Sequence, residues 1–176
     1  MRRIVVVVIL MLASFAAFCQ QEWMPKSYDI SFKIKNLGAT VTGRFYDLRS
    51  KLMFNPDRVE QSSMEASVGV ATIKTGIKMR DKHLRSKKFF DAEQYKRIEI
   101  KSVKLYRKDA QFAGLFDVTI KGVTKQVEIP FEFNQLGDES DLKGSFTINR
   151  RDYGVGGGYL FMGNNVKVAI DIKVKK

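Results

Sequence analysis

The sequence is poor in the residues that build disulfides, metal sites and nucleophilic centres. Its 176 residues include one cysteine, Cys19, and one histidine, His83. A single cysteine excludes a disulfide within the chain, and a lone histidine without a second histidine or a thiolate lacks zinc-ligand spacing. The sequence contains no G-x-S-x-G nucleophile motif, and the glycines at 156–158 are not followed by Gly-Lys-Ser/Thr, so a loop is favoured over a phosphate site there. These absences predict a protein that is not an enzyme.

The longest hydrophobic run lies at the N-terminus. Arg2 and Arg3 precede the run IVVVVILMLASFAAF, and Cys19 follows it. A basic start, an apolar centre and a small-residue end are typical of a secretory signal peptide, and the run is short for a membrane span. We expect a signal peptide at residues 1–19, a mature domain at residues 20–176 and a periplasmic or secreted location. The alternative is a lipid anchor on Cys19, which we rank second because Phe18 is large at a position that lipoprotein signals keep small.

The chain is strongly basic, with a formal net charge of +12. Removal of residues 1–19 takes away Arg2 and Arg3 and leaves +10. Such a charge would suggest nucleic acid as the partner of a cytosolic protein, but export argues against nucleic acid. We expect a transient contact with an anionic membrane surface instead, with the C-terminal lysines, such as Lys173 and Lys175, as secondary contributors.

Apolar and polar residues alternate with a period of two along most of residues 28–174, and no stretch shows helical periodicity over more than about two turns. The pattern predicts about eight or nine strands. At Ser102 the phase slips by one residue, which predicts a β-bulge after which Val103 and Leu105 continue the apolar face. The expected strands lie near residues 28–34, 41–45, 52–54, 64–70, 98–105, 112–120, 127–133, 142–148 and 166–174.

Hairpin-length connections between these strands predict an all-β fold, an antiparallel up-and-down barrel of about eight strands. An apolar interior is favoured, because the Lys and Glu of the polar faces would crowd the narrow lumen of a membrane barrel of this size. Residues 75–102 interrupt the strands and predict a short helical insertion. Asp81 is expected to cap one helical turn, and Asp91 with Gln94 a second. The adjacent Phe89 and Phe90 are too apolar for an exposed linker and are expected to pack on the barrel as a lid.

Several short sequence motifs are distributed over essentially the whole expected mature domain. They are Ile30-x-Phe32-x-Ile34-Lys35, Val41-x-Gly43-x-Phe45, Arg80-Asp81-Lys82-His83-Leu84, Phe89-Phe90-Asp91, Gly122-Val123-Thr124-Lys125, Ile148-x-Arg150 or Arg151-x-Tyr153-Gly154, and Val166-x-Val168-x-Ile170-Asp171. In this order the motifs resemble the YceI-like family of periplasmic polyisoprenoid-binding proteins. Asn36 departs from the histidine usual in the family, and Lys96 from its proline. The resemblance implies an extended lipocalin-like barrel that holds a long isoprenoid lipid, such as a polyprenyl or quinone-type chain, in its interior.

The candidate ligand-binding residues are the inward-facing apolar residues and four residues of the central interruption, expected at the barrel entrance. They are Phe32, Ile34, Val41, Phe45, Met64, Val68, His83, Leu84, Phe89, Phe90, Phe112, Phe116, Phe131 and Phe146. Such residues would also fill an ordinary core. Gly43, Ala66, Gly114 and Gly144 fall in the same inward phase, and their missing side chains could leave a channel. His83 is expected to make a structural hydrogen bond near the barrel mouth and to bind no metal.

Taken with the resemblance, these features predict an exported carrier or reservoir for an isoprenoid-type lipid. We expect no cofactor besides the bound lipid, and a monomer or homodimer. The alternative is a structural or interaction module with a filled core that acts through its basic surface. An enzyme acting on an isoprenoid or quinone ranks third, because only His83, Asp81 and Asp91 could converge at the mouth.

Overall fold

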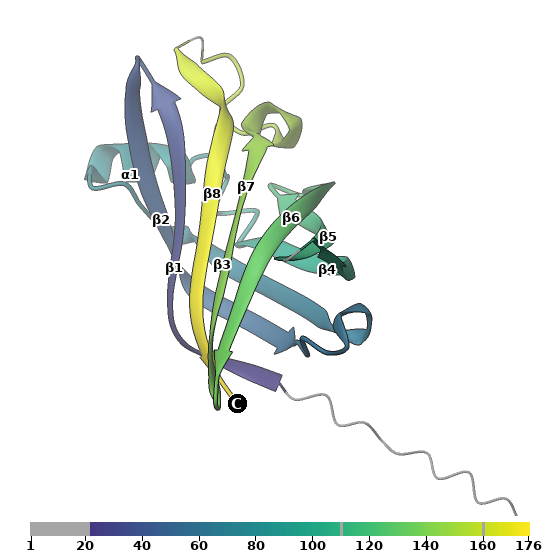
Figure 1. Cartoon of the computed structure of the whole chain (residues 1–176). Coiled ribbons are helices and arrows are strands. Elements are labelled where there is room, and N and C mark those ends of the chain that lie inside the picture. Colours follow the sequence, from purple (N-terminus) through teal and green to yellow (C-terminus); the bar gives the residue numbers. More distant parts are fainter. Residues whose placement is uncertain (1–21, 110, 160) are drawn as a thin grey trace, which may run out of the picture.

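The computed structural model describes residues 22–109, 111–159 and 161–176, so the expected signal peptide and Cys19 lie outside the described residues. The described residues form eight antiparallel strands that close into a barrel in chain order, with β8 beside β1 (Figure 1), which confirms the predicted fold class. The strands are β1 (Glu22–Asn36), β2 (Ala39–Met53), β3 (Ser63–Lys74), β4 (Arg97–Lys108), β5 (Gln111–Ile120), β6 (Val123–Leu136), β7 (Glu139–Asn149) and β8 (Met162–Lys175). One α-helix, α1 (Lys78–Arg85), and two 3₁₀ turns, η1 (Val59–Gln61) and η2 (Arg150–Tyr153), interrupt them. No helix within the described ranges is long and apolar enough to cross a membrane.

The two strands expected at residues 41–45 and 52–54 are one strand, β2, because an irregularity in its middle changes the phase of the alternation. Its pairing with β3 shifts register between Arg44 and Arg49, and Asp47 there has a φ of +57°. Aspartate tolerates this left-handed conformation better than most residues. Arg97 of β4 stabilises the irregularity, since its Nη1 and Nη2 donate to the Asp47 carboxylate and carbonyl, each at 2.6 Å.

The second irregularity lies where the sequence predicts it. The pairing of β4 with β5 shifts between Ser102 and Lys104, so the extra residue is Val103. Leu105 is buried as expected, whereas Val103 is half exposed and does not continue the inward face. The difference follows from the geometry of a bulge, in which the extra residue leaves the regular alternation.

One end of the barrel is closed by an aromatic plug, which we define as Trp23, Phe54, Phe112, Phe131 and Phe133. The Phe54 ring contacts the rings of Phe112, Phe131 and Phe133 edge-on, with centroid distances of 5.1, 5.5 and 4.7 Å. Trp23 packs edge-on against Phe133 at 5.1 Å, and its Nε1 donates to the Phe54 carbonyl at 2.8 Å. This buried donor is therefore satisfied, which lets a large aromatic residue seal the end without an unpaired polar group.

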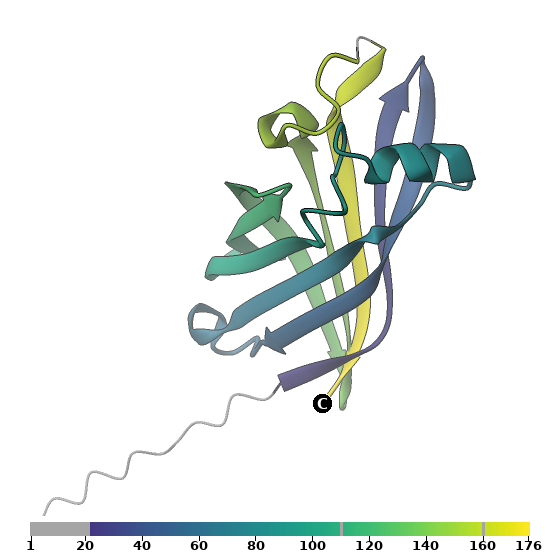
Figure 2. The ribbon, with the colours of Figure 1, turned by 180° about the vertical axis from the view of Figure 1, so that it is seen from behind.

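The opposite end carries the irregular elements. Figures 1 and 2 show the β1–β2 hairpin, α1, η2 and the loop before β8 gathered at the end of the barrel away from the C-terminus. The Leu37 amide donates to the Phe161 carbonyl at 3.0 Å and joins the β1–β2 hairpin to the loop before β8. Any route into the barrel interior therefore has to be sought among these elements.

Candidate functional site

The barrel interior between the aromatic plug and the irregular end holds a cavity of about 490 Å³. Inward side chains of every strand except β6 line it, together with residues of α1 and η2. It reaches the surface at the irregular end, since Ile77 and Met79 line it and are more than half exposed. A second void of about 60 Å³ lies toward the plug and shares the lining residues Ala66, Ile100 and Ile170 with the first. The site is thus a hollow that opens at the irregular end and has a mostly hydrocarbon wall.

Most of the predicted site residues line this cavity, whereas four lie closer to the plug. Met64, Phe116 and Phe131 line the smaller void, and Phe112 packs in the plug against Phe54 and Phe131. Alternation identifies the face of a strand but says nothing of depth along the barrel, so the sequence could not separate the two groups. The predicted residues that line the cavity are Phe32, Ile34, Val41, Phe45, Val68, His83, Leu84, Phe89, Phe90 and Phe146.

The inward glycines do not create the cavity, contrary to the expectation from their phase. A Cβ at Gly43 would lie 2.3 Å from the Phe32 ring, and one at Gly114 would lie 2.5 Å from Leu105 and 2.6 Å from the Phe116 ring. Neighbouring large side chains therefore occupy the space that these two glycines leave. Of the four small residues in this row, only Ala66 lines the main cavity, and Gly144 lines the smaller void.

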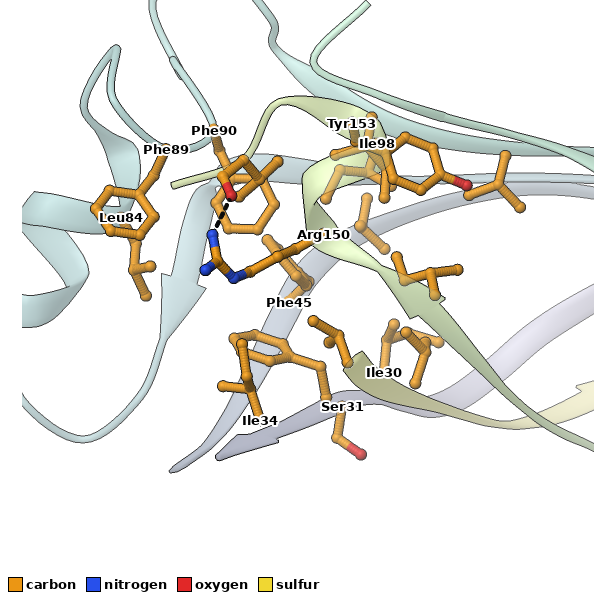
Figure 3. A pocket seen from close by; sticks show the side chains of 18 of the residues that line it. Ile30, Ser31, Ile34, Phe45, Leu84, Phe89, Phe90, Ile98, Arg150 and Tyr153 are labelled. Carbon is orange, nitrogen blue, oxygen red and sulfur yellow. Dashed lines mark hydrogen bonds between the residues drawn. The ribbon is translucent and has the colours of Figure 1, made fainter. Parts of the chain in front are cut away.

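The segment between β3 and β4 forms one wall of the mouth. Leu84 comes from α1, and Phe89 and Phe90 from the turn that follows it; Figure 3 shows them across the pocket from Ile30 and Ile34. Phe89 is buried, and the Phe90 ring packs edge-on against Phe45 with a centroid distance of 5.7 Å. The expected packing of this phenylalanine pair on the barrel is therefore present.

His83 makes a hydrogen bond at the mouth, as predicted. Its Nε2 lies 3.1 Å from the Tyr159 hydroxyl, and its ring packs edge-on against Phe89 at 4.9 Å. The hydrogen bond links α1 to the loop before β8, and the ring contact links α1 to the turn that follows it. No group of three or more His, Cys, Asp or Glu among the residues with described positions is arranged to hold a metal ion.

The predicted helix caps are wrong. α1 begins at Lys78, and Asp81 lies inside it, where its carboxylate accepts from the Thr75 amide at 2.8 Å and hydroxyl at 2.6 Å. Asp81 thus ties the helix back to the end of β3. Asp91 begins no second helix, because the chain makes a single turn there, with the Tyr95 amide donating to the Asp91 carbonyl at 2.8 Å. Local sequence patterns cannot distinguish a cap from a side chain that anchors a neighbouring loop.

Arg150 is the functional-site residue that the sequence left ambiguous. The family-like segment matches either Arg150 or Arg151, and the structure buries Arg150 at 3% exposure while Arg151 is exposed. Its Nε donates to the Gly163 carbonyl at 2.9 Å, and Nη1 donates to the carbonyls of Val155, at 2.7 Å, and Gly156. Burial, together with the adjacent charge of Arg151, lowers the pKa of Arg150 below its ordinary value.

The Arg150 side chain organises the loop before β8 from inside the mouth. Figure 3 shows its guanidinium group among the side chains that line the pocket, near Phe90 and Phe45. Its donors reach two carbonyls of the loop and two at the start of β8, counting the weaker contact from Nη2 to the Met162 carbonyl at 3.2 Å. A regular strand end would satisfy these carbonyls with backbone amides, so Arg150 replaces that pairing where the barrel is open.

Tyr153 lines the cavity from η2 and is 2% exposed. Its hydroxyl has no hydrogen-bond partner among the described residues, and burial raises the pKa of Tyr153 above its ordinary value. The side chain therefore acts as a neutral aromatic wall. Since Arg80 and His83, like Arg150, are engaged in contacts with the protein, the site is suited to binding an apolar molecule.

Comparison with known proteins agrees with this architecture. Residues 22–174 match the family model described as the YceI-like domain. A UPF0312 protein of Pseudomonas fluorescens is 35% identical over 142 residues, which cover 71% of this chain and 70% of the relative. The crystal structure of BcnA from Burkholderia cenocepacia has a TM-score of 0.80 at 22% identity and covers 83% of this chain and 95% of BcnA. A polyisoprenoid-binding domain from Saccharophagus degradans, implicated in plant cell wall breakdown, has a TM-score of 0.67 at 13% identity, with coverages of 88% and 97%. The chain therefore belongs to the YceI-like family.

Proposed function

We propose that this protein is a lipid carrier or reservoir that holds an isoprenoid-type chain, of the polyprenyl or quinone kind, inside its barrel. The observation that supports this proposal is the hydrocarbon-lined cavity of about 490 Å³ inside the barrel. It favours lipid binding over the module with a filled core, because a filled barrel would have no such space. The solved polyisoprenoid-binding domain of the same fold makes an isoprenoid the first ligand to test.

The cavity also suggests how much of a chain is enclosed. At roughly 30 Å³ for each non-hydrogen atom, a volume of about 490 Å³ holds about 16 atoms, or roughly three isoprene units. A longer chain would leave its remainder at or beyond the mouth. Each enclosed methylene contributes about 0.8 kcal/mol, so affinity should rise about fourfold per carbon and level off once the cavity is full.

Native mass spectrometry of protein purified without detergent, followed by solvent extraction, tests the proposal. A discrete adduct that extracts as a polyprenyl or quinone species is the expected result. A bare polypeptide mass that gains nothing when polyprenyl lipids or quinones are added would overturn it and favour the interaction module. Turnover of the added lipid, detected as a changed lipid mass, would favour the enzyme that ranks third.

Export is a separate part of the proposal and has its own measurement. Cleavage after Cys19 would give a mature chain that begins at Gln20 and is periplasmic or secreted. An intact mass with that N-terminus supports export as a free protein. A mass that includes Cys19 with acyl chains would support the lipid anchor instead.

A further inference from the structure

Four large apolar side chains are exposed at the open end of the barrel, and we call them the rim. They are Leu37, Ile77, Met79 and Phe161, with exposures of 72, 53, 77 and 73%. Leu37 and Phe161 are joined by the backbone hydrogen bond between the β1–β2 hairpin and the loop before β8. Ile77 and Met79 line the cavity and so mark the edge of its mouth. Single exposed apolar residues are common, but a group of them around one opening indicates an interaction surface.

Lysine and arginine residues surround two of the rim residues in the sequence. Residues 75–88, which carry Ile77 and Met79, contain six lysines and arginines and one acidic residue, Asp81. Asp81 is buried and accepts hydrogen bonds from Thr75, so it does not offset the charge at the surface. Within the described part of the chain, none of the four lysines of this segment, Lys78, Lys82, Lys87 and Lys88, forms an ion pair. The mouth therefore presents apolar tips beside uncompensated positive charge.

We propose that the rim docks on a lipid bilayer that contains anionic phospholipid, with the barrel mouth facing the membrane. Apolar side chains that enter the acyl boundary, together with cations at the level of the phosphates, are the combination that holds peripheral proteins on such surfaces. A bilayer fits better than a protein partner, because the rim residues project from three separate segments around an opening and form no continuous face. The choice of lipid as partner rests in part on the proposed function, since a lipid passing between bilayer and cavity would cross this mouth.

The rim differs from the C-terminal lysines that the sequence suggested for membrane contact. The C-terminus lies at the other end of the barrel, beside the β6–β7 hairpin, where the Lys176 amide donates to the Asp138 carbonyl at 2.9 Å (Figure 1). That hairpin carries Leu136, which is 87% exposed and remote from the mouth. Leu136 therefore offers a matched control, an exposed apolar residue on a hairpin at the opposite end.

Cosedimentation with vesicles of equal parts phosphatidylcholine and phosphatidylglycerol tests the docking. The full mature chain is expected to bind them and not pure phosphatidylcholine vesicles, and to lose binding as ionic strength rises from about 0.1 M to about 1 M. The double variant L37S/F161S should bind about tenfold more weakly or worse, because it removes two of the inserted side chains. The charge variant K78E/K82E should weaken binding similarly at low salt, whereas L136S should bind like the wild type.

The outcomes separate this proposal from the proposed function. If L37S/F161S and K78E/K82E bind the vesicles as tightly as the wild type, or if L136S loses as much binding as they do, docking through the rim is overturned. L37S/F161S and K78E/K82E change no residue that lines the cavity, so both should still carry extractable lipid, and their lipid transfer to vesicles should slow in parallel with their weaker binding. Protein that carries lipid but never associates with anionic vesicles overturns docking alone. Protein that docks through the rim but takes up no polyprenyl lipid supports docking and overturns the carrier function.

Discussion

Replacing Ala66 with phenylalanine should shorten the cavity from its inner end. Ala66 lines both the main cavity and the smaller void, so its side chain lies where the two meet. The substitution adds about six carbon atoms, which occupy roughly 180 Å³ at about 30 Å³ per atom. That is more than a third of the cavity of about 490 Å³. The room for an enclosed chain falls from about 16 to about 10 non-hydrogen atoms.

The loss of affinity follows from the chain carbons that can no longer be buried. About six methylenes at about 0.8 kcal/mol each correspond to about 5 kcal/mol, or more than three orders of magnitude in Kd. The effect should depend on chain length. A ligand with about 16 chain carbons should bind A66F far more weakly than it binds the wild type. A ligand with about ten chain carbons should bind both proteins with equal affinity. Titration of both ligands against wild type and A66F by calorimetry measures the difference.

Ala169 provides the matched control for this substitution. It lies on β8 between the inward residues Val168 and Ile170, and it is exposed on the outer face. A169F therefore adds the same ring outside the barrel and should leave both affinities unchanged. If folded A66F binds the longer chain as tightly as A169F does, the chain is not enclosed at this depth and the assignment of the cavity as the site is refuted.

Three further substitutions separate stability from binding. R150M leaves the carbonyls of Val155 and Gly163 without their donor and should destabilise the fold by about 3 kcal/mol or more; hydrogen exchange should rise at residues 154–164, and unchanged protection there would contradict the anchoring role. Y153F removes a buried hydroxyl without a partner among the described residues and should raise the free energy of unfolding by about 1 kcal/mol in urea titrations. The gain in free energy of unfolding of Y153F over the wild type should grow above about pH 10. In the wild type the raised pKa keeps Tyr153 neutral in the folded state while tyrosine ionises in the unfolded chain, which favours unfolding. A gain that shrinks above this pH would oppose this account. F54A opens the aromatic plug and should cost about 3–5 kcal/mol of stability while lipid affinity stays unchanged, since Phe54 does not line the main cavity; selective loss of binding at normal stability would place the ligand deeper.

The sequence predicted those features of the fold that follow from the alternation of apolar and polar residues. Alternation identified the inward faces, and the slip at Ser102 located a bulge. With a period of two, a shift of one residue moves each side chain to the opposite face, so an apolar face fixes the orientation of the strand. It failed at Asp47, where the phase changes inside a single strand. A left-handed residue at that point follows from contacts with Arg97, which lies far along the chain, so no local pattern records it.

The candidate site was predictable in composition but not in depth. Phe45 and Phe112 have the same inward pattern, yet one lines the cavity and the other seals the end. Depth depends on strand tilt and on where Trp23 and Phe54 enter the barrel, which are tertiary properties. The same limit explains why Gly114 suggested a channel, since the approach of Leu105 and Phe116 over it is visible only in the fold.

Side chains satisfy loop backbone at both ends of the barrel, and at the mouth this bears on how the site works. At the closed end, apolar rings fill the space, and Trp23 and Arg107 donate to the carbonyls of Phe54 and Pro56 in the loop after β2. At the mouth, strand pairing cannot continue without closing the opening, so side chains must satisfy loop backbone instead. Arg150 and Asp81 do so from inside the wall. Their polarity therefore serves the shape of the opening, and changes at these residues should alter the rate at which a chain enters more than the affinity of a chain already enclosed.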